Sequence, residues 1–114
     1  MGNRGLTIED DCNVGIGTRI LTETDNYDGT ALVGSMFPLK YRKSSGAPLK
    51  ICQFVNIGMN TTILPVDEIP IGVAIGANSL ITKPLLPWSI YAGVPAKFIK
   101  PRSKDMINIK DRLE

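Results

Sequence analysis

Three carboxylates lie within one stretch of six residues, in the string Thr-Glu-Thr-Asp-Asn-Tyr-Asp-Gly: they are Glu23, Asp25 and Asp28. A carboxylate that faces a bound nucleophile can take up its proton. The chain has no histidine, which excludes a Ser-His-Asp or Cys-His arrangement and a zinc site of the carbonic anhydrase type. The carboxylates are therefore the first candidates for proton transfer. The alternative is a solvated turn held by Asx hydrogen bonds.

Basic residues gather towards the other end of the chain. Ammonium and guanidinium groups bind anionic oxygens through charge-assisted hydrogen bonds. The basic residues are Lys83, Lys97, Lys100, Arg102 and Lys104. They could hold an anionic ligand, and the alternative is a charged tail in contact with solvent.

A six-residue repeat must position both sets of side chains. Isoleucine or valine recurs at every sixth position, in two blocks: Ile8, Val14 and Ile20, then Ile51, Ile57, Ile63, Ile69, Ile75 and Ile81. An interval of six is neither the 3.6-residue period of a helix face nor the alternation of an ordinary strand. It is typical of a coil built from short strands and turns. The recurring residues are expected to point inwards.

The third residue after these aliphatic positions predicts a tight corner. It is Asp11, Gly17, Asn60, Gly72 or Asn78 in five of the repeats. These residue types enter the left-handed backbone region at least cost. Each hexapeptide is therefore interpreted as one short strand and one corner. Three of them close a triangular coil of about eighteen residues, and coils stack at roughly 4.8 Å.

The repeat divides the chain into segments within a single domain, residues 1–114. Residues 8–20 supply the first repeats, and residues 51–83 supply the main repeats. Between them, residues 21–50 do not keep the six-residue interval and are rich in Asp, Gly, Ser and Pro. This segment is therefore expected to leave the prism as a protruding loop that returns at Ile51.

The C-terminal residues 84–114 are expected to form a turn, a strand and a helix. Three prolines predict an irregular turn over residues 84–96. A short strand is expected over residues 97–100 and a helix over residues 103–113. The aromatic residues Trp88 and Tyr91 are expected to plug the end of the prism, with adenine stacking as the alternative.

Two motifs in this half of the chain carry a resemblance. IGANSLITK is followed a few residues later by YAGVPAKFIKPRSK. This order resembles the C-terminal half of the left-handed β-helix hexapeptide-repeat acyltransferases, in particular bacterial enzymes that acylate sugars and amino sugars. The resemblance covers residues 51–104 closely and the first twenty residues loosely. It implies an all-β, left-handed parallel β-helix of about three coils, here a short member or one that lacks N-terminal coils.

The resemblance implies a coenzyme A site between two prisms, with acetyl-CoA as the expected acyl donor. Small residues let the pantetheine arm lie close to the backbone, although a corner also demands compact side chains. The positions that correspond to the arm-binding backbone are Gly76, Ala77, Ser79 and Thr82. The side chains suited to the phosphates are Lys83, Lys97, Lys100 and Arg102.

The same resemblance implies that the loop helps to form the acceptor pocket. Many members use a histidine base for a sugar hydroxyl, which this chain lacks. An amine acceptor makes a weaker demand, because it attacks before it loses its proton. Asp25 is the first candidate for the base, followed by Asp28 and Glu23. Tyr27 and Asn26 are candidates for positioning the acceptor.

Composition and charge narrow the remaining classes of protein function. A net charge of +2 is too small to suggest nucleic-acid binding. The sequence has no apolar run of transmembrane length and no secretory leader, so a cytoplasmic protein is expected. Cys12 and Cys52 are too few for a disulfide framework or a zinc knuckle and are expected to be free thiols, with no metal bound.

Two functions remain open at this point. The first is a coenzyme A-dependent acyltransferase, most simply an acetyltransferase, that modifies a sugar or amino sugar of surface polysaccharide. The second is a non-catalytic β-helix derived from such an enzyme and kept for binding or assembly. The resemblance implies a homotrimer in both cases.

Overall fold

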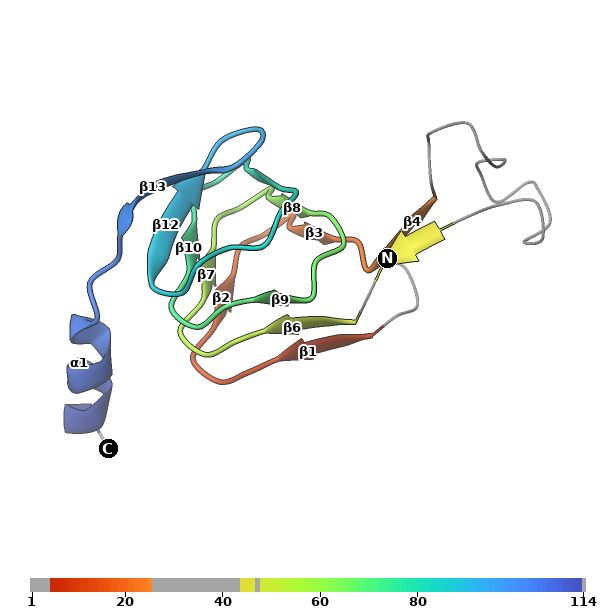
Figure 1. The fold of residues 1–114 in the computed structure, drawn as a ribbon. Helices are drawn as coiled ribbons and strands as arrows, with labels where there is room; N and C mark the ends of the chain where they lie inside the picture. The colour runs from red at the N-terminus through yellow and green to blue at the C-terminus, as the bar shows by residue number, and fades with distance from the viewer. Residues whose placement is uncertain (1–4, 26–43, 47, 114) are drawn as a thin grey trace.

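The computed structural model describes residues 5–25, 44–46 and 48–113. Over these ranges the chain winds as a left-handed parallel β-helix of three coils (Figure 1). A helix stands at one corner of the three-sided prism, and a two-stranded ribbon leaves from another. The predicted fold class is confirmed.

Each side of the prism is one sheet, and we name the three sides faces A, B and C. Face A consists of β1 (Leu6–Ile8), β6 (Leu49–Ile51) and β9 (Glu68–Ile69). Face B consists of β2 (Asn13–Val14), β7 (Asn56–Ile57), β10 (Ala74–Ile75) and β12 (Ser89–Ala92), with β13 (Lys97–Pro101) antiparallel at its edge. Face C consists of β3 (Arg19–Ile20), β8 (Thr62–Ile63) and β11 (Leu80–Ile81). The ribbon is formed by β4 (Glu23–Asp25) and β5 (Ser44–Gly46), and the helix is α1 (Asp105–Leu113).

The aliphatic repeat forms three columns inside the prism. Equivalent residues of successive coils are in register, in the columns Ile8–Ile51–Ile69, Val14–Ile57–Ile75–Tyr91 and Ile20–Ile63–Ile81. None of the six isoleucines of the second and third coils is more than 4% exposed. Burial of such a side chain stabilises the fold by about 1.5–3 kcal/mol. The columns are therefore the hydrophobic core, as predicted.

The first coil departs from the inward prediction. Ile8 is 48% exposed and Val14 is 37% exposed. Their strands pair on one side only within the described residues. The backbone register is the predicted one, and the exposure arises because no described coil covers this end of the prism.

The corners adopt the predicted left-handed conformation. All five predicted residues have positive φ angles, between 57° and 78°: Asp11, Gly17, Asn60, Gly72 and Asn78. Phe54 (φ 64°) and Trp88 (φ 52°) do the same, although an aromatic side chain gives no such signal in the sequence. Each positive φ turns the chain sharply enough for the next short strand to begin a new face.

Three boundaries differ from the sequence prediction. The chain rejoins the prism at Leu49, two residues before Ile51, because Leu49 pairs with Leu6. Residues 84–96 are not wholly irregular, because β12 runs through them between two prolines and pairs with β10. The predicted strand and helix near the C-terminus are present as β13 and α1, and the helix begins at Asp105.

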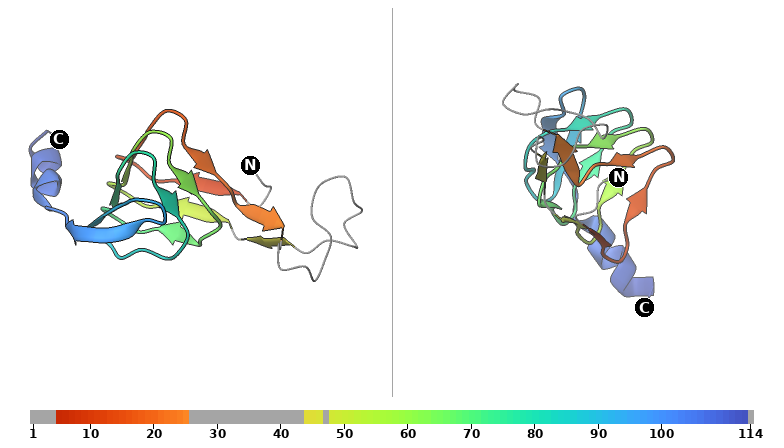
Figure 2. Two further views of the ribbon diagram at one scale, coloured as in Figure 1. Left: turned by 90° about the horizontal axis from the view of Figure 1, so that it is seen from above. Right: turned by 90° about the vertical axis from the view of Figure 1, so that its right-hand side faces the viewer.

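The prism has three edges, named for the faces that they join. Edge AB carries α1, edge BC carries the Gly76–Ser79 corner, and edge CA carries the ribbon. Figure 2 shows α1 and the ribbon leaving from opposite sides of the prism. No helix in the described ranges is long and apolar enough to cross a membrane.

Candidate functional site

The loop predicted over residues 21–50, which contains Glu23, Asp25 and Asp28 and is called the acidic loop below, leaves the prism at edge CA. β3 ends at Ile20, and the amide of Leu21 still donates to the carbonyl of Ile63 in the coil above. β4 then pairs with β5 in antiparallel register, with Asp25 opposite Ser44. Of the predicted acceptor-side residues, the backbones of Glu23 and Asp25 are thus placed at the base of the loop. Asn26, Tyr27 and Asp28 lie outside the described residues, and their roles stay predictions.

The predicted donor corner lies at edge BC. The buried Ser79 hydroxyl donates to the Gly76 carbonyl at 2.6 Å and accepts the Gly93 amide at 3.2 Å. Ala77 is exposed at the tip. The coils are in close backbone contact here, since a Cβ on Gly58 would lie 2.8 Å from Ala77 Cα. A narrow corner of this kind lets an extended ligand approach the main chain.

Thr82 and Lys83, two of the residues predicted to bind the donor, lie near the base of the acidic loop. They follow β11 at edge CA, on the same edge as the loop and two coils above it. Two coil spacings amount to roughly 10 Å. Face C therefore has the Gly76–Ser79 corner along one border and the loop, with Thr82 and Lys83, along the other.

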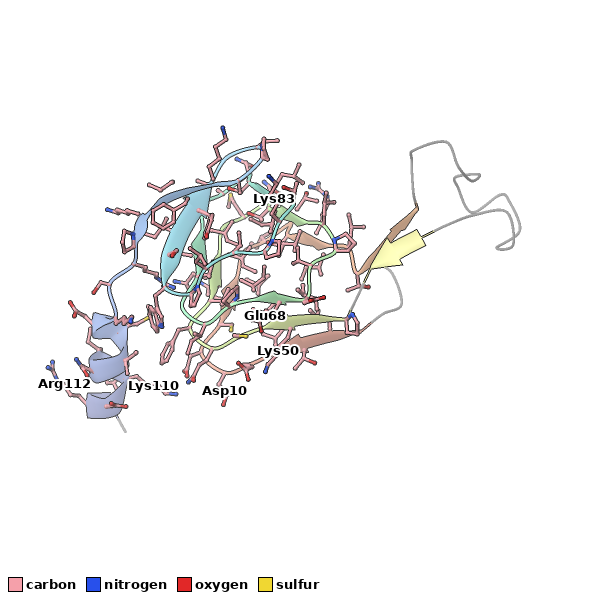
Figure 3. The ribbon with its side chains drawn as sticks, in the orientation of Figure 1. Asp10, Lys50, Glu68, Lys83, Lys110 and Arg112 are labelled. Atoms are coloured by element: carbon pink, nitrogen blue, oxygen red, sulfur yellow. The ribbon has the colours of Figure 1, made fainter. Side chains whose placement is uncertain are left out.

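The structure spreads out the remaining basic residues. Lys97 and Lys100 lie on β13, beyond the edge of face B. Figure 3 shows Lys83 on a different side of the prism from Lys110 and Arg112, which lie on α1. The basic residues are thus not one cluster, because β13 carries them from edge BC to edge AB.

The Arg102 side chain contacts backbone carbonyls of the prism. Its Nη1 donates to the carbonyls of Phe54 at 2.7 Å and Gly72 at 2.9 Å. Partial burial lowers the pKa of the guanidinium. These bonds fasten the segment before α1 to the corners of edge AB. The predicted phosphate-binding role of Arg102 stays untested by them.

Edge AB also holds α1 through charges. Asp11 accepts hydrogen bonds from the Lys110 ammonium and the Gln53 amide, and these bonds lower the pKa of the Asp11 carboxyl. The Lys110 ammonium also lies 5.6 Å from the centre of the Phe54 ring. The Lys104 ammonium lies 5.9 Å from the centre of the Trp88 ring. Lys104, part of the basic set in the sequence, thus lies against the aromatic corner.

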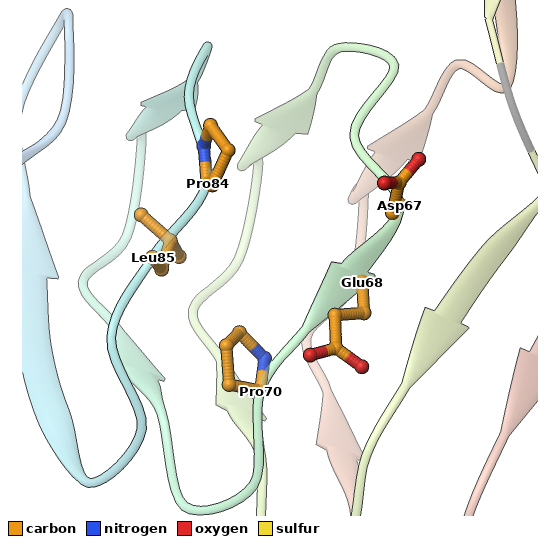
Figure 4. Close-up of a pocket in the computed structure, with 5 residues that line it drawn as sticks. All are labelled: Asp67, Glu68, Pro70, Pro84 and Leu85. Carbon is orange, nitrogen blue, oxygen red and sulfur yellow. The ribbon is translucent and has the colours of Figure 1, made fainter.

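A separate pocket lies on face A near edge CA (Figure 4). Its volume is about 280 Å³, and its lining residues are Asp67, Glu68, Pro70, Pro84 and Leu85. The thiol of Cys52 is 3.6 Å from a Glu68 oxygen, and burial, with the nearby Glu68 carboxylate, raises the pKa of Cys52. Two carboxylates would repel phosphate groups, so this pocket does not suit a coenzyme A or nucleotide phosphate. Nothing in the sequence analysis singled it out.

Both cysteines are free thiols, as predicted. Within the described ranges, no three His, Cys, Asp or Glu side chains converge where they could hold a metal ion.

Comparison with known proteins gives the same fold with a similar sequence. The chain superimposes on an N-acyltransferase from Bacillus cereus, AntD, in complex with dTDP and 3-hydroxybutyryl-CoA, with a TM-score of 0.93 and 30% identity over 98% of this chain and 60% of AntD. The chain is thus similar in sequence and fold to acyltransferases of the hexapeptide-repeat family. No family model matches the sequence.

Two curated relatives of this family match different lengths of the chain. A dTDP-4-amino-4,6-dideoxy-D-glucose acyltransferase of Escherichia coli is 27% identical over 96% of this chain and 57% of its own length. A probable macrolide acetyltransferase of Lysinibacillus sphaericus is 53% identical over 43% of this chain and 27% of its own length. The chain thus spans less than two thirds of each relative.

Proposed function

We propose that the protein transfers an acyl group from acyl-coenzyme A to the amino group of a nucleotide-linked sugar. The observation that supports this most strongly is that the donor corner and the acidic loop border the same face of the prism. A thioester bound along edge BC would extend across face C towards the loop. The similar AntD is known with a nucleotide and an acyl-coenzyme A.

The chemistry needs only groups that this chain has. The acceptor nitrogen attacks the thioester carbonyl carbon, a C–N bond forms, the C–S bond breaks, and coenzyme A leaves as the thiol. The proton lost by the nitrogen passes to a carboxylate, for which Asp25 is the first choice because it lies at the base of the loop. Asp28 and Glu23 are the other choices.

We propose that three copies form the working unit. Face C is open in one copy, and a neighbouring prism would turn it into a cleft that excludes water. In that cleft Gly76, Ala77, Ser79 and Thr82 would line the pantetheine arm, and Lys83 would be the nearest cation for a phosphate. Acetyl is the simplest acyl group for the donor, and the cytoplasm is the compartment that supplies it.

A donor titration followed by turnover tests the proposal. Calorimetry with acetyl-CoA and 3-hydroxybutyryl-CoA is expected to show micromolar binding, and the longer acyl group decides whether acetyl is preferred. Turnover is then measured with dTDP-4-amino-4,6-dideoxyglucose. Absence of heat at millimolar donor would leave the non-catalytic β-helix as the function.

The Asp25→Asn variant tests the base. We expect kcat to fall by about 10²–10⁴-fold, the usual contribution of a general base, with unchanged donor affinity. Asp111→Asn, on the exposed surface of α1, is the control. Undiminished turnover in Asp25→Asn would remove Asp25 as the base and leave the acyl transfer itself in place.

A further inference from the structure

The outer surface of face C is nearly without charge. Its three strands have Arg19, Thr62 and Leu80 in register, each next to a residue of the Ile20–Ile63–Ile81 column. Side chains alternate across a strand, so these three residues point away from the core. Arg19 is exposed, and it is the one charged residue in the three strands of this face.

Among the described side chains, Glu9 and Asp11 of the first coil each contact a basic side chain, whereas Arg19 and Asp10 have no ion pair. Glu9 lies 3.6 Å from the ammonium of Lys50, and Asp11 is bonded to Lys110. Among the residues whose side chains the structure describes, which do not include Glu23 and Asp25, no carboxylate contacts the Arg19 guanidinium. Arg19 thus presents an unused cation on a neutral surface.

The position of Arg19 relates it to the acceptor side of the face. It belongs to the first coil, from which the acidic loop leaves, and lies four residues before Glu23. Four residues of extended chain span at most about 14 Å. The Gly76–Ser79 corner belongs to the third coil, roughly 10 Å further along the prism. A donor bound at that corner and an acceptor bound beside Arg19 would meet at the base of the loop.

We infer that Arg19 binds the diphosphate of the nucleotide-linked acceptor and makes the protein select a nucleotide sugar over a free amino sugar. This inference rests on the proposed function and adds to it a residue that sets specificity. The planar guanidinium presents paired N–H donors that match phosphate oxygens. A diphosphate would also supply the negative charge that face C lacks.

Arg19→Gln and Arg19→Lys test the inference, with Arg112→Gln on the exposed surface of α1 as the matched control. Affinity for dTDP is measured by calorimetry and turnover with the dTDP-linked amino sugar. In Arg19→Gln we expect dTDP affinity and KM for the acceptor to worsen about tenfold or more, the effect of losing hydrogen bonds to a charged group. We expect kcat to change less than threefold, Arg19→Lys to retain part of the affinity, and Arg112→Gln to match the native chain.

The other outcomes separate this inference from the proposed function. Equal dTDP affinity in Arg19→Gln and Arg112→Gln would overturn it. A loss of acyl-coenzyme A binding in Arg19→Gln would also overturn it, since Arg19 would then hold the donor. A change in the number of copies that associate in solution would overturn it as well, since Arg19 would then hold an interface between copies. If the native chain binds acyl-coenzyme A but not dTDP, the inference fails while acyl transfer stands. If it binds neither, the proposed function fails.

Discussion

Replacing Gly72 by alanine tests how the aromatic corner closes the prism. Gly72 has φ +74°, and a Cβ there would lie 2.5 Å from Trp88 Cε2, with two further indole atoms closer still. The left-handed backbone costs alanine about 1–2 kcal/mol. Displacing a packed, rigid ring adds about 1–3 kcal/mol. We therefore expect Gly72→Ala to lower the free energy of unfolding by about 2–5 kcal/mol.

Urea unfolding followed by fluorescence measures this directly, because Trp88 is the one tryptophan of the chain. The control is Gly17→Ala, whose φ of +78° is nearly the same. Its Cβ would meet chiefly the side-chain amide of Asn60, which can rotate away. Gly17→Ala should therefore cost only the backbone part. Protein concentration is held constant, since association would shift both midpoints. Equal losses in the two variants would refute the steric role of Trp88.

Three further predictions concern the core, α1 and the thiols. Ile69→Ala should cost about 2–5 kcal/mol in urea unfolding, whereas Ile8→Ala, in the same column but 48% exposed, should cost less than half as much. Because hydrogen bonds lower the Asp11 pKa from 3.8, the stabilisation that they give is complete well above pH 3.8 and disappears as the pH falls through the lower folded-state value. The urea midpoints of the native chain and Asp11→Asn should therefore differ at about pH 6 and converge only below about pH 4. Burial raises the Cys52 pKa, so mass spectrometry at pH 8 should show slower alkylation of Cys52 than of Cys12.

The regular part of the fold could be predicted because one physical constraint repeats in it. An inward Ile at every sixth position and a residue tolerant of positive φ three positions later determine strands, corners and register together. The failures fall where that constraint is absent. Phe54 takes the left-handed corner without a favourable residue type, because the Arg102 and Trp88 contacts hold it there. β12 could not be predicted, because the prolines on either side of it indicated an irregular turn.

The site proposed on face C could be predicted only in part, because its residues come from different coils. The small residues of the Gly76–Ser79 corner and the acidic string could be recognised from residue type and resemblance. Arg19 could not, since an arginine in a short strand gives no signal until the register shows that it shares face C with both. Conversely, Arg102 looked like one of a basic group, and its carbonyl contacts become visible only in three dimensions.

The arrangement of edges restricts how such a chain can change in length. Every hexapeptide advances the chain by one side, so removing six residues between Ile51 and Ile81 would rotate everything that follows by a third of a turn and send α1 to a different corner. Removing eighteen residues would shorten the prism by one coil and leave every later segment on the same face or edge. Length variation that preserves activity in such chains should therefore come in whole turns, or within loops that leave and rejoin at the same corner.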